Sequence, residues 1–218
     1  FSCPQGKEMD AKREALNVLC IVSEKEDEEY PDPKKGATAS DELAEELRTL
    51  RESSKLDKYQ HIDMGIQGTV LIVINDEDCD PDLIVASIFR KMSETKKTLF
   101  ALCTRLYPIS IASKASIESI QDNSSIKEYI SKYMCSSRPV IKFRIVYKKS
   151  LNNEIRRLEV IKAIASFVDP KHKVDMESPD VTIIINVMKS ICTVALSSNH
   201  HRYCEYSVFR FLKSLKNK

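Results

Sequence analysis

Residues 139–147 read Pro-Val-Ile-Lys-Phe-Arg-Ile-Val-Tyr, and their alternation of apolar and charged side chains predicts a β-strand. The odd-numbered apolar positions share one face, because successive residues of a strand point to opposite sides. We expect that face to pack on a hydrophobic core. The other face is cationic, since Lys142, Arg144 and Lys148 are spaced along it.

The segments around this strand predict a mixed domain of helices and strands. Helical periodicity runs over about 113–134, with an interruption at 122–124, and returns at 154–167. Two further stretches, 181–187 and 191–196, are apolar and rich in β-branched residues, which predicts strands.

The first half of the chain predicts a separate unit. We expect strands at 1–3, 59–63, 69–74 and 98–106, and helices at 9–30 and 81–94. An acidic insert at about 24–57, with its own helix at 40–55, interrupts this pattern. Without the insert the order is βαββαβ, which is the ferredoxin-like split βαβ arrangement.

We therefore expect the α+β (α/β) class with two domains. The N-terminal ferredoxin-like domain is expected to span 1–111, and a second domain to span 112–212. Residues 213–218 are interpreted as a basic tail.

Composition and charge narrow the possible functions. The 218 residues are 42% hydrophobic, and no apolar run approaches the roughly 18 residues that cross a bilayer. Residues 1–90 hold 11 basic and 21 acidic side chains, a net charge of −10. Residues 91–218 hold 23 basic and 11 acidic side chains, a net charge of +12, so the total of +2 conceals two oppositely charged halves. The basic half predicts an acidic partner, nucleic acid or an anionic membrane, unless the acidic insert alone skews the balance. Because the chain starts at Phe1 rather than Met, we also expect sequence upstream.

Cysteine and glycine usage argues against a metal or nucleotide enzyme. The seven cysteines include no CxxC pair, which predicts free thiols in a reducing compartment, either nuclear, nucleolar or cytoplasmic. The four glycines form neither a GxGxxG nor a Walker motif. His200, His201 and Cys204 lack the paired spacing of structural zinc ligands. We expect no metal, no cofactor and no catalytic residue in this chain.

An ordered string of short motifs resembles one known family. The motifs are Phe143 to Lys148, Asn152-Asn153, Arg157, Lys173-Val174-Asp175, Ser178-Pro179-Asp180 and Lys189, preceded by Arg105-Leu106-Tyr107-Pro108 and Lys114-Ala115. Together they resemble a THUMP domain, in the version found in the adaptors of tRNA cytidine acetylation. The resemblance covers nearly the whole chain apart from the acidic insert.

This resemblance implies a fold and a function. The family joins an N-terminal ferredoxin-like domain to a THUMP domain, which binds tRNA at the acceptor stem and the single-stranded 3′ CCA end. This branch is not catalytic. It presents tRNA to a separate RNA cytidine acetyltransferase, which forms N4-acetylcytidine in the D-arm of serine and leucine tRNAs. Acetyl-CoA and ATP would then be cofactors of that partner.

The candidate RNA-binding residues are mostly cations, because neutralised phosphates release counterions and so drive affinity. Asn152 and Asn153 either donate to RNA or cap the helix that follows them. Tyr147 either stacks on an unpaired base or packs in the core, and its position in the apolar alternation favours the core. The complete set is Arg105, Lys114, Lys142, Arg144, Tyr147, Lys148, Lys149, Asn152, Asn153, Arg156, Arg157 and Lys189.

Two other functions remain open at this point. The chain could be the RNA-binding module of a tRNA-modifying enzyme whose catalytic domain lies outside it. Alternatively it could be a protein-interaction scaffold centred on the acidic region, in which case RNA binding with a strong salt dependence is not expected.

Overall fold

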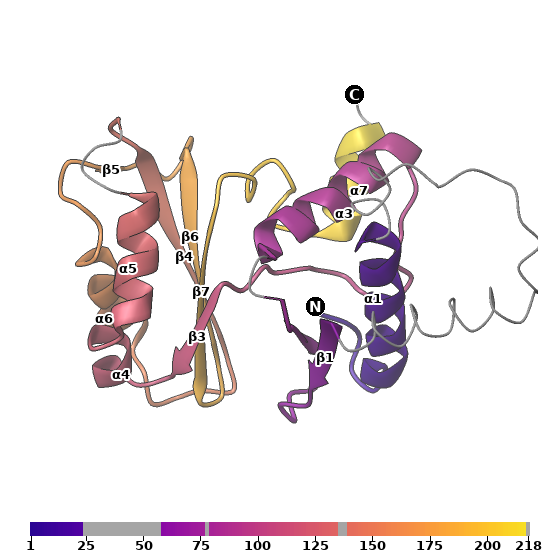
Figure 1. Cartoon of the computed structure of the whole chain (residues 1–218), viewed down its shortest axis with the longest axis horizontal. Helices are drawn as coiled ribbons and strands as arrows, with labels where there is room; N and C mark the ends of the chain where they lie inside the picture. The colour runs from indigo at the N-terminus through magenta and orange to yellow at the C-terminus, as the bar shows by residue number, and fades with distance from the viewer. Residues whose placement is uncertain (24–57, 77–78, 135–138, 217–218) are drawn as a thin grey trace, which may run out of the picture. The chain divides into compact units, whose positions relative to one another are not determined.

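The computed structural model describes residues 1–23, 58–76, 79–134 and 139–216 (Figure 1). The acidic insert with its predicted helix lies outside these residues. The chain divides into two compact units, one formed by 1–107 with 207–218 and the other by 108–206. The boundary between the first and second units follows Tyr107, whereas the sequence predicted it after residue 111.

The first unit contains three helices and a small antiparallel sheet among its described residues. The helices are α1 (Glu8–Ser23), α3 (Pro81–Thr95) and α7 (Val208–Lys216). Strands β1 (Tyr59–Ile62) and β2 (Leu71–Ile74) pair with each other. The predicted extension of the first helix to residue 30 lies outside the described residues.

Isolated bridges complete the sheet of the first unit. Ser2 bridges antiparallel to Thr69 on one side and to Arg105 on the other, and Arg105 also bridges to Ser207. The neighbour order from Arg105 through Ser2 and β2 to β1, with every pair antiparallel, agrees with the predicted split βαβ arrangement. Two of its four strands are reduced to bridges.

Of the predicted strand at 98–106 only the bridge at Arg105 forms, and Glu14 explains why the residues before it do not pair. The Glu14 carboxylate accepts the backbone N–H groups of Ala101, Leu102 and Cys103, so these donors are not available to a neighbouring strand. Burial alone would raise the pKa of Glu14. The three hydrogen bonds outweigh burial and hold this pKa below its ordinary value.

Residues 213–216 of the predicted basic tail belong to helix α7, which spans Val208–Lys216, and 217–218 lie outside the described residues. Val208 and Phe211 are buried, and the Phe211 ring meets Phe89 of α3 edge-on with centroids 5.0 Å apart. This contact, together with a hydrogen bond from Val208 N to Thr104 O, places the segment in the first unit.

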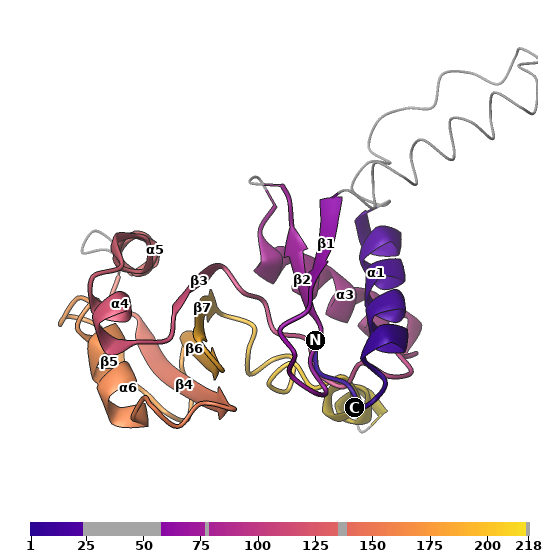
Figure 2. The same cartoon turned by 90° about the horizontal axis from the view of Figure 1, so that it is seen from below.

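The second unit is a five-stranded sheet with helices on one face (Figures 1 and 2). Its strands lie in the order β3–β7–β6–β4–β5, with β4 parallel to both β5 and β6 and the other pairs antiparallel. The bounds are β3 (Ile111–Lys114), β4 (Lys142–Ser150), β5 (Lys173–Val174), β6 (Val181–Met188) and β7 (Ile191–Ser197).

Helices α4 (Ile117–Gln121), α5 (Ser124–Tyr133) and α6 (Arg157–Ala165) pack on this sheet and enclose its core. The core takes alternate residues of the strands, including Phe143 of β4, Ile185 of β6 and Val194 of β7. The predicted break at 122–124 is confirmed, since Asn123 caps α5 by accepting a hydrogen bond from Ile126 N. The predicted helical start at 113 is wrong, because β3 continues to Lys114 beside β7.

Candidate nucleic-acid interface

Cations from four separate segments meet at one edge of the second unit's sheet. The parallel strands β4 and β6 end side by side there, with Lys149 opposite Val187, and the turn after β6 carries Lys189. Strand β3 ends at the same edge, with Lys114 opposite Ile191. Helix α6 begins after the loop that leaves β4. We call this surface the cationic edge; its members, all exposed, are Lys114, Lys149, Arg156, Arg157 and Lys189.

Asn152 ties the loop after β4 to the turn after β6. Its Nδ2 donates to Lys189 O at 2.6 Å, and its Oδ1 accepts from Glu154 N and Ile155 N, both at 3.1 Å. Lys189 N in turn donates to Ser150 O at 3.0 Å. Asn152 is only 7% exposed, so it acts as a structural link within the cationic edge.

Replacing Asn152 by alanine should therefore destabilise the second unit by about 2 kcal/mol, because three backbone groups lose a buried partner. Urea unfolding of the wild type and the variant measures the difference. Asn153→Ala is the matched control, since Asn153 is exposed in the same loop. Equal stability of the two variants would contradict the linking role of Asn152.

Neither asparagine caps helix α6, contrary to the capping interpretation. The N-cap residue is Arg156, which makes no side-chain capping hydrogen bond. Its guanidinium lies 4.0 Å from the Glu159 carboxylate, at the limit of an ion pair. The first turn of α6 thus offers backbone N–H groups and two arginines at the same place, an arrangement suited to an anion.

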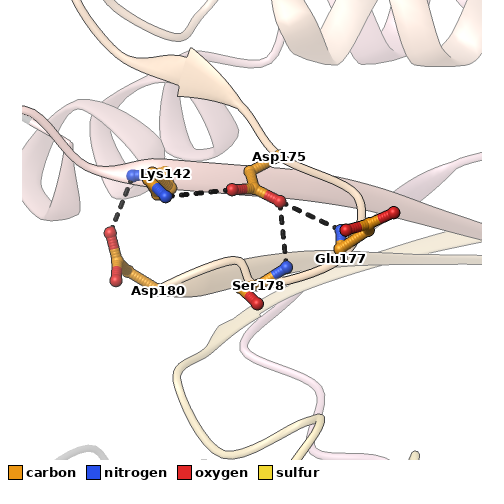
Figure 3. A network of polar contacts seen from close by, with 5 residues as sticks. All are labelled: Lys142, Asp175, Glu177, Ser178 and Asp180. Carbon is orange, nitrogen blue, oxygen red and sulfur yellow. Dashed lines mark hydrogen bonds and ion pairs between the residues drawn. The ribbon is translucent and has the colours of Figure 1, made fainter.

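Lys142 lies away from the cationic edge, at the start of β4. Its Nζ lies 3.1 Å from Asp175 Oδ2, and its backbone N donates to Asp180 at 2.8 Å (Figure 3). The N–H of Ser178, the Lys142 ammonium and the N–H of Glu177 hold the pKa of Asp175 below its ordinary value. The Lys142 charge is therefore balanced within a local network. Lys149 lies seven positions further along the extended strand, about 23 Å away.

Arg144 points to the sheet face opposite the helices and holds a loop there. Its Nη2 lies 2.9 Å from His200 Nδ1, and its Nε donates to Thr182 Oγ1 at 3.3 Å. Since a guanidinium can only donate, Nδ1 accepts and the His200 proton sits on Nε2. Desolvation and the nearby Arg144 charge lower the pKa of His200 to about 4. Tyr206 covers the same face and donates to Ser197 Oγ at 2.5 Å.

The remaining predicted residues occupy varied positions. The Tyr147 ring packs against the core of the second unit, and burial raises the pKa of its hydroxyl. Lys148 is half-buried on the Arg144 face of β4. Arg105 belongs to the first unit, where its Nη1 donates to Tyr107 Oη at 3.3 Å.

Two exposed leucines that adjoin the cationic edge are absent from the residues predicted from the sequence. Leu151 follows β4 and is 66% exposed, and Leu158 in the first turn of α6 is 68% exposed. Sequence spacing gives no sign of Leu151, because its exposure follows from its backbone conformation.

The described residues contain neither a metal-ligating cluster nor a membrane-crossing helix. No group of three or more His, Cys, Asp and Glu side chains in this part of the chain could hold a metal ion. None of the helices there has the length and apolarity needed to cross a membrane.

Comparison with known proteins identifies the second unit. Residues 114–197 match the sequence profile of the THUMP domain, a range that includes every member of the cationic edge. The chain is 27% identical over 186 residues to THUMP domain-containing protein 1 of Mus musculus and 26% identical over 186 residues to that of Homo sapiens. Each match covers 80% of this chain and 50% of the relative, so the chain spans about half the length of the curated relatives it matches.

Among solved structures, the crystal structure of PH1313 from Pyrococcus horikoshii Ot3 aligns with a TM-score of 0.45 and 14% identity, covering 75% of this chain and 52% of that one. The sequence matches are the informative comparison. The chain therefore contains a THUMP domain at residues 114–197 and is homologous to THUMP domain-containing protein 1.

Proposed function

We propose that this chain binds tRNA through the cationic edge of its THUMP domain. The observation that carries the proposal is the convergence of five exposed cations from four segments of the chain on one edge of the sheet. Exposed cations add nothing to the packing of the core, and a group of them on one surface is what binding to a phosphate backbone requires.

The local charge balance supports a polyanionic ligand. Between residues 142 and 162 the sequence holds seven basic and two acidic side chains, a net charge of +5 over one strand, one loop and one helix. The backbone N–H groups at the start of α6, which no side chain caps, add a partial positive charge. Binding that depends on such a surface releases condensed counterions and weakens steeply with salt.

We further propose that the chain acts as an adaptor without chemistry of its own. It would present tRNA to a separate RNA cytidine acetyltransferase for N4-acetylcytidine formation in the D-arm of serine and leucine tRNAs. The motif resemblance to the acetylation adaptors supports this finer assignment, as does the homology to THUMP domain-containing protein 1. Acetyl-CoA and ATP would be bound by the acetyltransferase.

Titration of tRNA with and without its 3′ CCA end, over a range of salt, tests the RNA-binding proposal. We expect tighter binding of the intact tRNA and a slope of about −4 in a plot of log affinity against log salt, for four to five phosphate contacts. Absence of binding, or binding that ignores salt, would overturn the assignment of the cationic edge as an RNA surface.

Reconstitution with the purified acetyltransferase tests the adaptor proposal separately. Acetylcytidine in a serine tRNA is measured by nuclease digestion and mass spectrometry, with and without this chain. We expect the chain to increase the initial rate of acetylation at limiting tRNA. An unchanged rate, with tRNA binding intact, would refute the adaptor role and leave RNA binding standing.

A further inference from the structure

Leu151 is held in a conformation that its side chain disfavours. Its φ is 52°, in the left-handed region that suits glycine and asparagine. Its side chain is 66% exposed, so burial does not compensate for this strain. For the isolated protein, a large apolar residue here is unfavourable because its backbone is left-handed and because its side chain is exposed to water.

The surrounding structure fixes this conformation firmly. Lys189, across the edge, is also left-handed, with φ 49°. Asn152 joins the two strained positions, since it follows Leu151 directly and donates to Lys189 O at 2.6 Å, while Lys189 N donates to Ser150 O at 3.0 Å. Strain of this kind persists where neighbouring contacts over-determine the backbone, and it concentrates at ligand sites.

The result is an apolar side chain presented to solvent between cations. Leu151 lies in the loop between Lys149 and Arg156, and a hydrogen-bonded link connects that loop to the turn that carries Lys189. Leu158 repeats the combination beside Arg157. A ligand matched to this surface combines phosphates with a flat apolar face, which is the chemistry of an unstacked nucleotide.

We propose that Leu151 packs against the face of an unpaired base at the single-stranded end of the bound RNA, while Lys149 and Lys189 hold the adjoining phosphates. The inference rests on the proposed function and adds to it a base-contacting residue. An aliphatic contact of this kind is tolerant of base identity, because every base offers an apolar face.

The test compares an RNA hairpin that has a four-nucleotide single-stranded 3′ extension with the same hairpin ending blunt. Leu151→Asn removes the apolar group and suits the left-handed backbone, so its melting temperature is expected to be no lower than that of the wild type. We expect its affinity for the extended hairpin to fall about fivefold or more and its affinity for the blunt hairpin to stay within about twofold. Leu83→Asn, at a leucine that is 63% exposed on α3 of the first unit, is the matched control and should leave both affinities unchanged.

A second readout reports the base directly. With 2-aminopurine in the extension, the wild type should change the fluorescence of the base, and Leu151→Asn should abolish most of that change. If Leu151→Asn is poorly folded, Leu151→Gly serves in its place. If Leu151→Asn keeps the wild-type affinity for both hairpins, or loses affinity equally for both, the base contact is overturned while the proposed function stands. Failure of the wild type to bind either RNA would overturn the proposed function itself.

Discussion

Replacing Lys149 and Arg157 together by glutamate is expected to weaken tRNA binding by at least about a hundredfold in 0.1 M salt, equivalent to about 2.7 kcal/mol. Both side chains are exposed, and the described residues give neither an ion-pair partner. Each reversal removes an attraction to phosphate and adds a repulsion. Filter binding or fluorescence anisotropy over a salt series measures the loss, and the salt slope should become shallower by about two.

The matched control is the double reversal of Lys127 and Lys132, which lie exposed on α5 of the same unit. It changes the net charge of the chain by the same amount, so long-range electrostatics alone should weaken binding only slightly. A loss as large as that of the edge variant would show that the total charge, and not the cationic edge, governs binding. Arg144 is a poor target for such a test, because its reversal also breaks the contact with His200.

Acidification is expected to remove about 3 kcal/mol of stability from the second unit between pH 6.5 and pH 4, through His200 alone. The folded protein holds the pKa of His200 at about 4, against an ordinary value of 6.5, because the side chain is desolvated and faces Arg144. The unfolded chain therefore binds a proton first as the pH falls. The stabilising contribution is complete above pH 6.5 and is lost progressively as the pH falls toward 4.

Other charges near the imidazole modify this result without reversing it. Glu205 raises the pKa of His200, whereas Lys148 and His201 lower it. Urea unfolding at several pH values measures the effect in the wild type, in His200→Gln and in His201→Gln. The His200 variant should show a flatter dependence on pH, and the exposed His201 should behave as the wild type. A parallel dependence in all three proteins would contradict the prediction.

The elements that sequence predicts best are those with a strong period and a consistent environment. Strand β4 alternates between the core and the cationic face, and β6 and β7 are apolar because the helices cover one face and the Tyr206 segment covers the other. Strand β3 escaped prediction because its four residues alternate between half-buried and exposed, with no continuous apolar character. Helix α7 could have been found, since Val208, Phe211, Leu212 and Leu215 recur at helical spacing, but its lysines suggested a tail.

The candidate site was only partly predictable for a related reason. The sequence shows where the cations are along the chain. Which of them lie at the same edge of the sheet is decided by the register of β3 against β7 and of β4 against β6. Lys142 and Lys149 look equivalent in the sequence, yet the first is balanced by Asp175 and the second is exposed at the edge. The role of Asn152 depended on a partner 37 residues away, which no local pattern reveals.

The division of the chain has a consequence for its synthesis. The THUMP unit is one continuous segment, 108–206, set inside the sequence of the first unit. All residues of this inner unit are therefore synthesised before Phe211, whose ring contacts Phe89 of the first unit. Synthesis of the first unit starts before that of the THUMP unit and ends after it. The THUMP unit can therefore fold before the first unit is complete. In the nascent protein, the first unit therefore lacks the packing of helix α7 on α3 until after the THUMP unit has been synthesised.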